Sequence, residues 1–183
     1  MSIIRKITRP SIDPNALYGF VLRRSEVLTL VAEAYDFLLD GYRIIQNSDL
    51  AVCKATPSTR YCTRLMQKEA LLDGLDNIPE VDLTDWSSVL TSLKRRGKFV
   101  TIEDEARGRF LIGPIRRIDR RSATIACFDG AGKWLQAEKI TYVDITCVSF
   151  DSRYITTHQR YIGKTDMKSR DVRVNRAHSP KGE

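Results

Sequence analysis

The sequence lacks the residue spacings that hold metal ions or support redox chemistry. Its four cysteines include no Cys-x-x-Cys pair, and its two histidines, at positions 158 and 178, are not near them in the sequence. Zinc sites draw ligands in tight pairs, because two ligands from one turn must reach one ion. We therefore expect no metal and no cofactor. Cys127 and Cys147 fall in predicted strands, where a free thiol behaves as a small hydrophobic residue.

Long apolar runs and targeting signals are also missing. No window contains the ~18 uninterrupted apolar residues of a membrane span, and no Asn-x-Ser/Thr glycosylation site occurs. The Ile-rich residues 1–10 are interrupted by Arg5, Lys6 and Arg9, and no small-residue cleavage site follows an apolar core. By elimination, these absences predict a cytoplasmic protein with no membrane partner.

The catalytic motifs considered are incomplete or absent. No Gly-x-Ser-x-Gly elbow is present, and Asp129-Gly130-Ala131-Gly132-Lys133 lacks the spacing of a phosphate loop, so it predicts a hairpin turn. The acidic run 103–105, taken with Asp129, is interpreted as a solvated turn, because consecutive acids diverge into water and do not converge on a metal. His158 has no nucleophile at a fixed spacing and is expected to be exposed. We expect no catalytic residues and no enzymatic activity.

Positive charge is in excess: 30 Lys and Arg face 23 Asp and Glu, for a formal net charge of +7. Such a balance favours acidic partners such as nucleic acid, although a basic protein without a polyanionic ligand is the alternative. The 183 residues fit one large domain or two small ones, and the apolar content of 42 % is ordinary for a globular protein.

The most informative pattern is a strand-like segment that occurs twice. One copy runs from Gly19 to Asp49 and the other from Gly113 to Asp144, separations of 30 and 31 residues. We align Arg23-Arg24-Ser25 with Arg120-Arg121-Ser122, with the second copy three residues longer there. Small β-sheets share Gly, Asp and β-branched positions on physical grounds, so coincidence is the alternative to duplication.

Between the two copies the pattern changes from strand to helix. Ser58-Thr59 can cap a helix to about Leu72, and a second helix starts at Thr84 or Asp85, with Lys94-Arg95-Arg96 in its last turn and Gly97 as its stop. The apolar residues of the second helix fall at i, i+3, i+4 and i+7. We expect the two helices to form an antiparallel pair.

Periodicity and turn signals divide the chain into five segments. These are a lead-in at 1–15, a first small β unit at 16–55, a helical connector at 56–96, a β-barrel with a docked Tyr-Ile segment at 97–162, and a flexible basic tail at 163–183. The first unit shows no obvious opening strand. The second is expected to contain strands at 99–102, 109–118, 123–128, 133–139 and 145–150. The predicted core comprises Val21, Leu28, Leu30, Ile44, Leu65, Trp86, Leu90, Leu93, Val100, Ile115, Ile125, Ile145 and Val148.

Five short, bent antiparallel strands with a brief turn before the last one resemble an Sm-like small β-barrel. The residues that carry the resemblance are Gly113, the turn at 120–122, Asp129-Gly130 and the run from Ile140 to Val148. The resemblance covers 97–150 and, more weakly, 17–54, and the whole arrangement is similar to bacterial proteins of this build. It implies an α+β fold of two Sm-like barrel or half-barrel units joined by a helical pair. Sm-like proteins often bind RNA through family-specific loop residues, and no such loop motif stands out in this sequence.

Clustered basic residues provide the candidate binding site. Arginine suits phosphate because its planar guanidinium donates two parallel hydrogen bonds. Exposed Phe128, Trp134 or Tyr142 could add stacking faces for single-stranded nucleic acid; alternatively these aromatics are core and the arginines are scattered solvated charges. The candidate residues are Lys94, Arg95, Arg96, Lys98, Arg109, Arg116, Arg117, Arg120 and Arg121.

The pattern favours a non-catalytic binding module for RNA or another polyanion. A protein-interaction adaptor or subunit of a larger assembly is the alternative, because an incomplete first barrel would leave an edge that recruits partner strands. A metal-dependent hydrolase is a third, less favoured interpretation.

Overall fold

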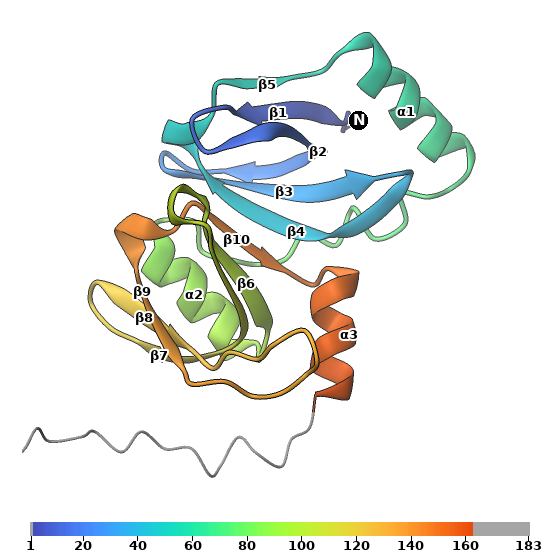
Figure 1. The fold of residues 1–183 in the computed structure, drawn as a ribbon. Helices are drawn as coiled ribbons and strands as arrows, with labels where there is room; N and C mark the ends of the chain where they lie inside the picture. The colour runs from blue at the N-terminus through green and yellow to red at the C-terminus, as the bar shows by residue number, and fades with distance from the viewer. Residues whose placement is uncertain (1, 163–183) are drawn as a thin grey trace, which may run out of the picture.

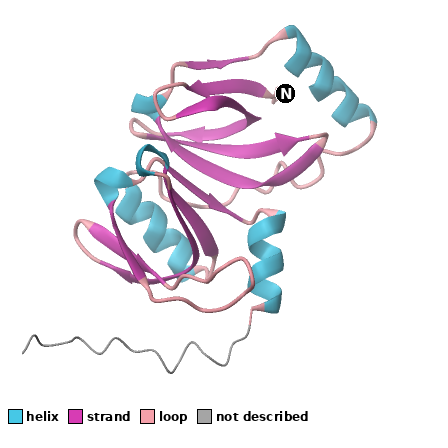
Figure 2. Ribbon diagram, viewed as in Figure 1, coloured by secondary structure: helices cyan, strands magenta, loops and turns pink. Residues whose placement is uncertain are grey.

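The computed structural model describes residues 2–162 as an α+β fold, with ten antiparallel strands in one open sheet and three α-helices (Figure 1, Figure 2). The predicted tail at 163–183 lies outside the described residues. The strands are β1 (Arg5–Arg9), β2 (Asp13–Arg24), β3 (Leu28–Tyr35), β4 (Leu38–Gln46), β5 (Val52–Lys54), β6 (Phe99–Asp104), β7 (Arg109–Ile118), β8 (Ser122–Ile125), β9 (Glu138–Thr141) and β10 (Cys147–Phe150). The helices are α1 (Pro57–Lys68), α2 (Trp86–Arg95) and α3 (Arg153–Tyr161).

The sheet consists of two halves with the same strand order. Its order is β5-β1-β2-β3-β4-β10-β6-β7-β8-β9, so in each half of five strands the fifth pairs with the first. The halves join where β4 pairs with β10, in the register Ile44 to Val148 and Ile45 to Cys147. The strand pairing does not close either half into a barrel, and β5 and β9 are the outer strands of the open sheet.

Equivalent glycines confirm the structural repeat. A Cβ atom on Gly19 would lie 2.4 Å from the carbonyl oxygen of Ala32, and one on Gly113 would lie 1.9 Å from that of Ala126. Both alanines follow their glycine by 13 positions. Since only glycine permits this close approach of two backbones, the same constraint operates in both halves.

The sequence alignment of the β2–β3 turn with the β7–β8 turn was wrong by three residues. A bulge follows each glycine at the same distance, between Val21 and Arg23 in β2 and between Ile115 and Arg117 in β7. Arg23 therefore corresponds to Arg117. The predicted alignment of 23–25 with 120–122 was wrong, because the second copy has no extra residues at this turn.

A single 3₁₀ turn precedes the last strand of each half. It spans Asn47–Asp49 in the first half and Tyr142–Asp144 in the second. The side chains that begin these turns tie down equivalent hairpins: the Asn47 amide donates to the Ser25 carbonyl at 2.9 Å, and the Tyr142 hydroxyl donates to the Asp119 carbonyl at 2.7 Å. The brief turn expected before the final strand is thus present in both halves.

The opening strand of the first half was missed in the sequence. β1 and the beginning of β2 occupy residues assigned to a lead-in, so the boundary between residues 15 and 16 was wrong. Ile7 pairs with Cys53, as Ile102 pairs with Val148 in the second half. Ile102 follows Ile7 by 95 positions, and Val148 follows Cys53 by the same number. β1 is therefore the counterpart of β6.

The first two helices are present, although α1 ends at Lys68 and not at about Leu72, and they do not form a pair. Thr56 caps α1 through the backbone N–H of Thr59 at 3.2 Å, two residues earlier than expected, and Asp85 caps α2 through the N–H of Ser88 at 2.7 Å. α1 lies beside the first half and α2 beside the second (Figure 1). The buried side chains of α1 pack against the first half, and those of α2 pack mainly against the second. Each helix instead covers a sheet face, because that is where its apolar stripe meets apolar partners.

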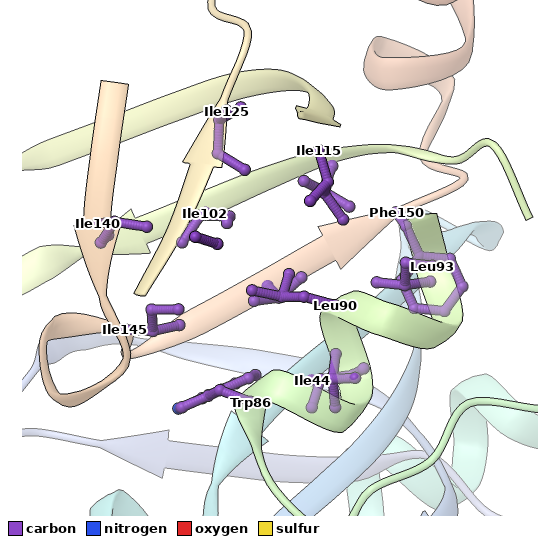
Figure 3. Close-up of a cluster of buried hydrophobic side chains, with 14 of the residues drawn as sticks. Ile44, Trp86, Leu90, Leu93, Ile102, Ile115, Ile125, Ile140, Ile145 and Phe150 are labelled. Carbon is purple, nitrogen blue, oxygen red and sulfur yellow. The ribbon is translucent and has the colours of Figure 1, made fainter. Parts of the chain in front are cut away.

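One hydrophobic core spans the two halves. Leu90 and Leu93 of α2 are fully buried and meet Ile44 from the first half and Phe150 from the second (Figure 3). Of the predicted core residues all are buried except Val21 and Leu65, which are half-buried. Since this cluster includes residues from both sheet halves, the β units are packed as one body.

The segment after β10 docks through its isoleucines. It forms α3, capped by Ser152, in which Ile155 is 1 % exposed; Ile162, just past the end of the helix, is also buried. Tyr154 and Tyr161 are 51 % and 76 % exposed. The predicted docking was therefore right for the isoleucines and wrong for the tyrosines.

The strands expected at 123–128 and 133–139 are shorter and shifted, at Ser122–Ile125 and Glu138–Thr141.

Candidate anion-binding surface

Four exposed arginines occupy the end of the β7–β8 hairpin. Arg116 and Arg117 lie in β7, Arg120 and Arg121 lie in the turn, and the Asp119 N–H closes that turn by donating to the Ser122 carbonyl at 2.8 Å. The hairpin holds these residues together because they are neighbours in sequence on a tight turn.

A cation from the preceding helix joins them. The Lys94 ammonium donates to the Arg116 carbonyl at 2.7 Å and so lies against this end of β7. We call Lys94, Arg116, Arg117, Arg120 and Arg121 the hairpin surface. It contains an ion pair between Arg117 Nε and Asp119 at 2.7 Å, at a partly exposed site where such a pair contributes little.

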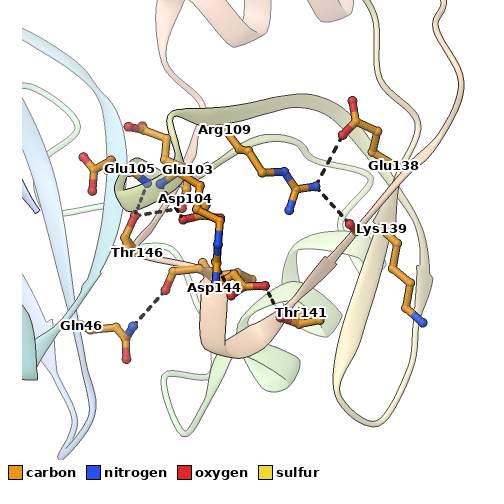
Figure 4. Close-up of polar contacts among 12 residues, drawn as sticks. Gln46, Glu103, Asp104, Glu105, Arg109, Glu138, Lys139, Thr141, Asp144 and Thr146 are labelled. Atoms are coloured by element: carbon orange, nitrogen blue, oxygen red, sulfur yellow. Dashed lines mark hydrogen bonds and ion pairs between the residues drawn. The ribbon is translucent and has the colours of Figure 1, made fainter.

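Three of the other predicted site residues form ion pairs with carboxylates outside this surface. Arg96 pairs with Glu80 at 2.9 Å, Lys98 pairs with Asp151 at 2.8 Å, and Arg109 lies 3.5 Å from Glu138 (Figure 4). Their charges are balanced by nearby carboxylates. Arg95 is exposed on α2 and lines a separate small depression with Asp82. Five of the nine predicted residues therefore belong to the hairpin surface, whereas Arg95, Arg96, Lys98 and Arg109 have other contacts.

The aromatic residues considered for stacking are mainly structural. Phe128 and Trp134 are buried at 3 % and 8 % exposure and meet edge to face, with ring centroids 5.8 Å apart. Tyr142 is half-buried and its hydroxyl holds the hairpin turn. The interpretation of Phe128 and Trp134 as core residues was correct.

The acidic run at 103–105 is not the solvated turn that was expected. Asp104 is 1 % exposed and accepts hydrogen bonds from the Arg107 backbone at 3.2 Å and guanidinium at 3.1 Å. Arg107 also binds Asp144. Hydrogen bonds from the Thr141 hydroxyl and from Arg107 lower the pKa of Asp144.

A buried arginine accounts for the third acid of the run. Arg9 is 3 % exposed and makes two hydrogen bonds to the Glu105 carboxylate, at 2.8 and 3.0 Å. It also donates to the Thr146 carbonyl at 3.3 Å. Burial raises the pKa of the adjacent Glu103, against the opposing charge of Arg43. Glu105 is thus paired with an arginine of the first half, and this ion pair helps to join the two halves.

The single histidine among the described residues is packed, contrary to expectation. The ring of His158 lies 5.1 Å from that of Phe128 and 4.7 Å from that of Tyr154.

Burial raises the pKa of the Cys127 thiol to about 11 and that of Cys147 to about 12. Both thiols are therefore protonated at neutral pH and unreactive.

Within residues 2–162 no group of three or more His, Cys, Asp and Glu side chains is arranged to hold a metal ion. In the same part of the chain, no helix combines the length and apolarity needed to cross a bilayer. The chain matches no protein-family model and has no significant match to a curated protein or to a solved structure.

Proposed function

We propose that the protein is a non-catalytic binding module that holds RNA or another polyanion on the hairpin surface. The observation that carries the proposal is that four exposed arginines lie on one hairpin end and that Lys94 contacts its backbone. Asp119 forms an ion pair with Arg117 there. Guanidinium groups on a short turn can donate hydrogen bonds to successive phosphates. The excess of positive charge attracts polyanions electrostatically.

The architecture supports the proposal indirectly. Each half has five antiparallel strands, a bulge in its second strand and a 3₁₀ turn before its last strand. These are the features on which the resemblance to Sm-like units rests. We infer that each half is an opened Sm-like unit, a group of proteins that often binds RNA.

Binding of a fluorescent single-stranded RNA, measured by anisotropy at several salt concentrations, tests the proposal. We expect log K to fall with log salt, since each neutralised phosphate of a single strand contributes a slope of about −0.7. A variant with Arg116, Arg117, Arg120 and Arg121 changed to Glu should lose both affinity and most of this slope.

The matched control places the same charge change on the first half. Arg5, Arg24, Arg60 and Arg64 are also exposed, and changing all four to Glu alters the net charge equally. The proposal requires this control to retain much more affinity than the hairpin variant. Equal losses in the two variants, or binding that is insensitive to salt, would rule out a site on the hairpin surface.

A second candidate function, assembly with another copy of the chain, is favoured by the two end strands of the sheet, which have a strand partner on one side only within residues 2–162. β5 and β9 are the outer strands, and they are the fifth and fourth strands of their halves. β10 is the counterpart of β5 in the second half, and β4 is the counterpart of β9 in the first half. These two counterparts already pair with each other inside the molecule. Repeating that register between two molecules would set Lys54 opposite Glu138, an attractive cross-strand pair.

Sedimentation velocity over a range of protein concentrations tests this assembly. Lys54→Glu should weaken the association by placing two acids opposite each other, and adding Glu138→Lys should restore it. A monomer at every concentration, or a double variant no stronger than the single one, would exclude pairing of these edges.

A further inference from the structure

A pocket of about 320 Å3 lies between α1 and the β3–β4 hairpin, away from the hairpin surface. Ile4 and Met66, which line it, are buried, at 4 % and 1 % exposure. Ala34 of β3 and Cys62 of α1 complete an apolar floor. Its volume is at the lower end of the range of about 300–1,000 Å3 in which small-molecule sites fall.

Three aromatic residues stand at the edge of this pocket with much of their surface in water. Tyr18, Tyr35 and Phe37 are 42 %, 76 % and 41 % exposed. Among the described residues that line the pocket, Asp36 is the one that carries a formal charge. An apolar floor with aromatic rings and one carboxylate at its edge suits a ligand that is apolar at one end and positively charged beside it.

The turn between β3 and β4, which carries Asp36 and Phe37, has an energetically unfavourable backbone conformation. Asp36 and Phe37 both have positive φ angles, 46° and 61°. Aspartate tolerates this region, but for a bulky residue such as phenylalanine it costs about 1–2 kcal/mol, which glycine would avoid. The turn nevertheless places an aromatic ring at the mouth of the pocket.

The second half of the molecule shows what fills the equivalent position. α3 follows β10 as α1 follows β5, and the cap of each helix is a hydroxyl that accepts the N–H three residues later, from Thr59 in α1 and from Ile155 in α3. This register makes Cys62 of α1 the counterpart of His158 of α3. Since Ala32 corresponds to Ala126, Ala34 corresponds to Phe128.

In the second half this position is occupied by aromatic rings. Phe128 is 3 % exposed, and its ring contacts His158 at 5.1 Å between centroids and Phe99 at 6.3 Å. The first half has Ala34 and Cys62 where the second has Phe128 and His158. The pocket is thus the volume that an aromatic side chain fills in the other copy of the repeat.

We propose that this pocket binds an external ligand made of one aromatic ring beside a positive charge, with the ring against Ala34 and the charge near Asp36. Residues 163–183 contain no Phe, Tyr or Trp, so the C-terminal segment of the chain cannot supply the ring. The ring comes from a free aromatic amine or from an aromatic residue next to a basic one in a peptide. Both sources share the chemistry that the pocket recognises.

Titrations followed by the methyl NMR signals of Ile4, Ala34 and Met66 test the proposal. Phenethylamine should shift these signals saturably. Isopentylamine, which has the charge without the ring, and phenylacetate, which has the ring with the opposite charge, should each bind at least about tenfold more weakly, a difference of about 1.4 kcal/mol. Acetyl-Phe-Arg-amide distinguishes the sources: tighter binding than phenethylamine assigns the ligand to a polypeptide, and weaker binding assigns it to a free amine.

Two variants locate the ring and the charge. Ala34→Phe places in the first half the side chain that the second half already accommodates, and it should abolish binding; Ala34→Leu is the smaller alternative if the first variant does not fold. Asp36→Asn should weaken binding about two- to fivefold, as expected for an exposed ion pair. Phe110→Ala, an exposed aromatic residue in the second half, should bind as the native protein does. The absence of saturable shifts with either probe, or unchanged binding in a folded Ala34 variant, would overturn the proposal.

Discussion

Arg9 and Glu105 form a two-hydrogen-bond ion pair that is nearly sealed from water. The guanidinium contacts both carboxylate oxygens, at 2.8 and 3.0 Å, and the two side chains are 3 % and 13 % exposed. The partners are 96 residues apart and belong to different halves of the sheet. This pair, the β4–β10 strand pairing and the shared hydrophobic core together hold the two copies of the repeat against each other.

Removing Arg9 should therefore be costly. In Arg9→Met the Glu105 carboxylate is left buried without its partner, which typically lowers the free energy of unfolding by about 3–5 kcal/mol. Urea titration followed by circular dichroism measures the loss. The control is Arg96→Met, whose partner Glu80 is 89 % exposed, and a change of at most about 1 kcal/mol is expected there. Similar losses in both variants would contradict a special role for the buried pair.

The repeat glycines provide a second prediction. Gly113→Ala puts a Cβ atom 1.9 Å from the Ala126 carbonyl oxygen, at a φ of +148° that L side chains rarely adopt. Because backbone must move to relieve the clash, we expect a loss of about 3 kcal/mol or more in the free energy of unfolding. Gly130→Ala, where nothing lies within 4 Å of the added atom, serves as the matched control. A stable Gly113→Ala protein would show that the close backbone approach is not a constraint.

Short-range features could be predicted from the sequence, and long-range pairing could not. Arg116 and Arg121 lie on one hairpin, as expected for sequence neighbours at a tight turn. The ion pairs of Arg96, Lys98 and Arg109 involve carboxylates 16, 53 and 29 residues away, and no local pattern reveals these contacts.

The missing first strand is a different kind of error. The strand at residues 5–9 has only five residues, three of them cationic, so its alternation of apolar and polar residues is weak. Extending the repeat backward by 95 positions from β6 would have identified β1 and would have aligned Arg9 with Asp104. The pocket was beyond reach at that level, because it arises from the smaller residues Ala34 and Cys62 at positions that become neighbours only in the folded chain.

Glu103 yields a prediction about pH. Because burial raises its pKa above the ordinary value, its ionised form is penalised in the folded state, and the penalty is relieved as pH falls through the raised pKa. Glu103→Gln should therefore raise the melting temperature at pH 7, and the gain should shrink as pH falls toward the ordinary range of glutamate. Scanning calorimetry at several pH values measures both trends. A variant that melts lower than the native protein at pH 7 would mean that attraction to Arg43 outweighs desolvation.

The four cysteines should divide into two classes. Cys53 and Cys62 are partly exposed, whereas Cys127 and Cys147 are buried with pKa values raised to about 11 and about 12. In the folded protein, Ellman's reagent should titrate two thiols rapidly at neutral pH, and the other two should react only in denaturant. A Cys53→Ser, Cys62→Ser protein should show almost no rapid reaction. Rapid reaction of that double variant would mean that the sheet opens readily around Cys147.

The internal comparison between Ala34 and Phe128 can be tested in reverse. Phe128→Ala gives the second half the residue found in the first, and it should lower the free energy of unfolding by about 3–5 kcal/mol, because a buried ring is lost and a cavity remains. The cavity should take up benzene, since apolar cavities of this kind stay dry and bind apolar solutes, and bound benzene should recover part of the melting temperature. Ala34→Phe is the opposite change, from cavity to ring, and should raise the melting temperature. If Phe128→Ala costs less than about 1 kcal/mol, the ring does not support the second half, and the equivalence of the two positions loses its energetic basis.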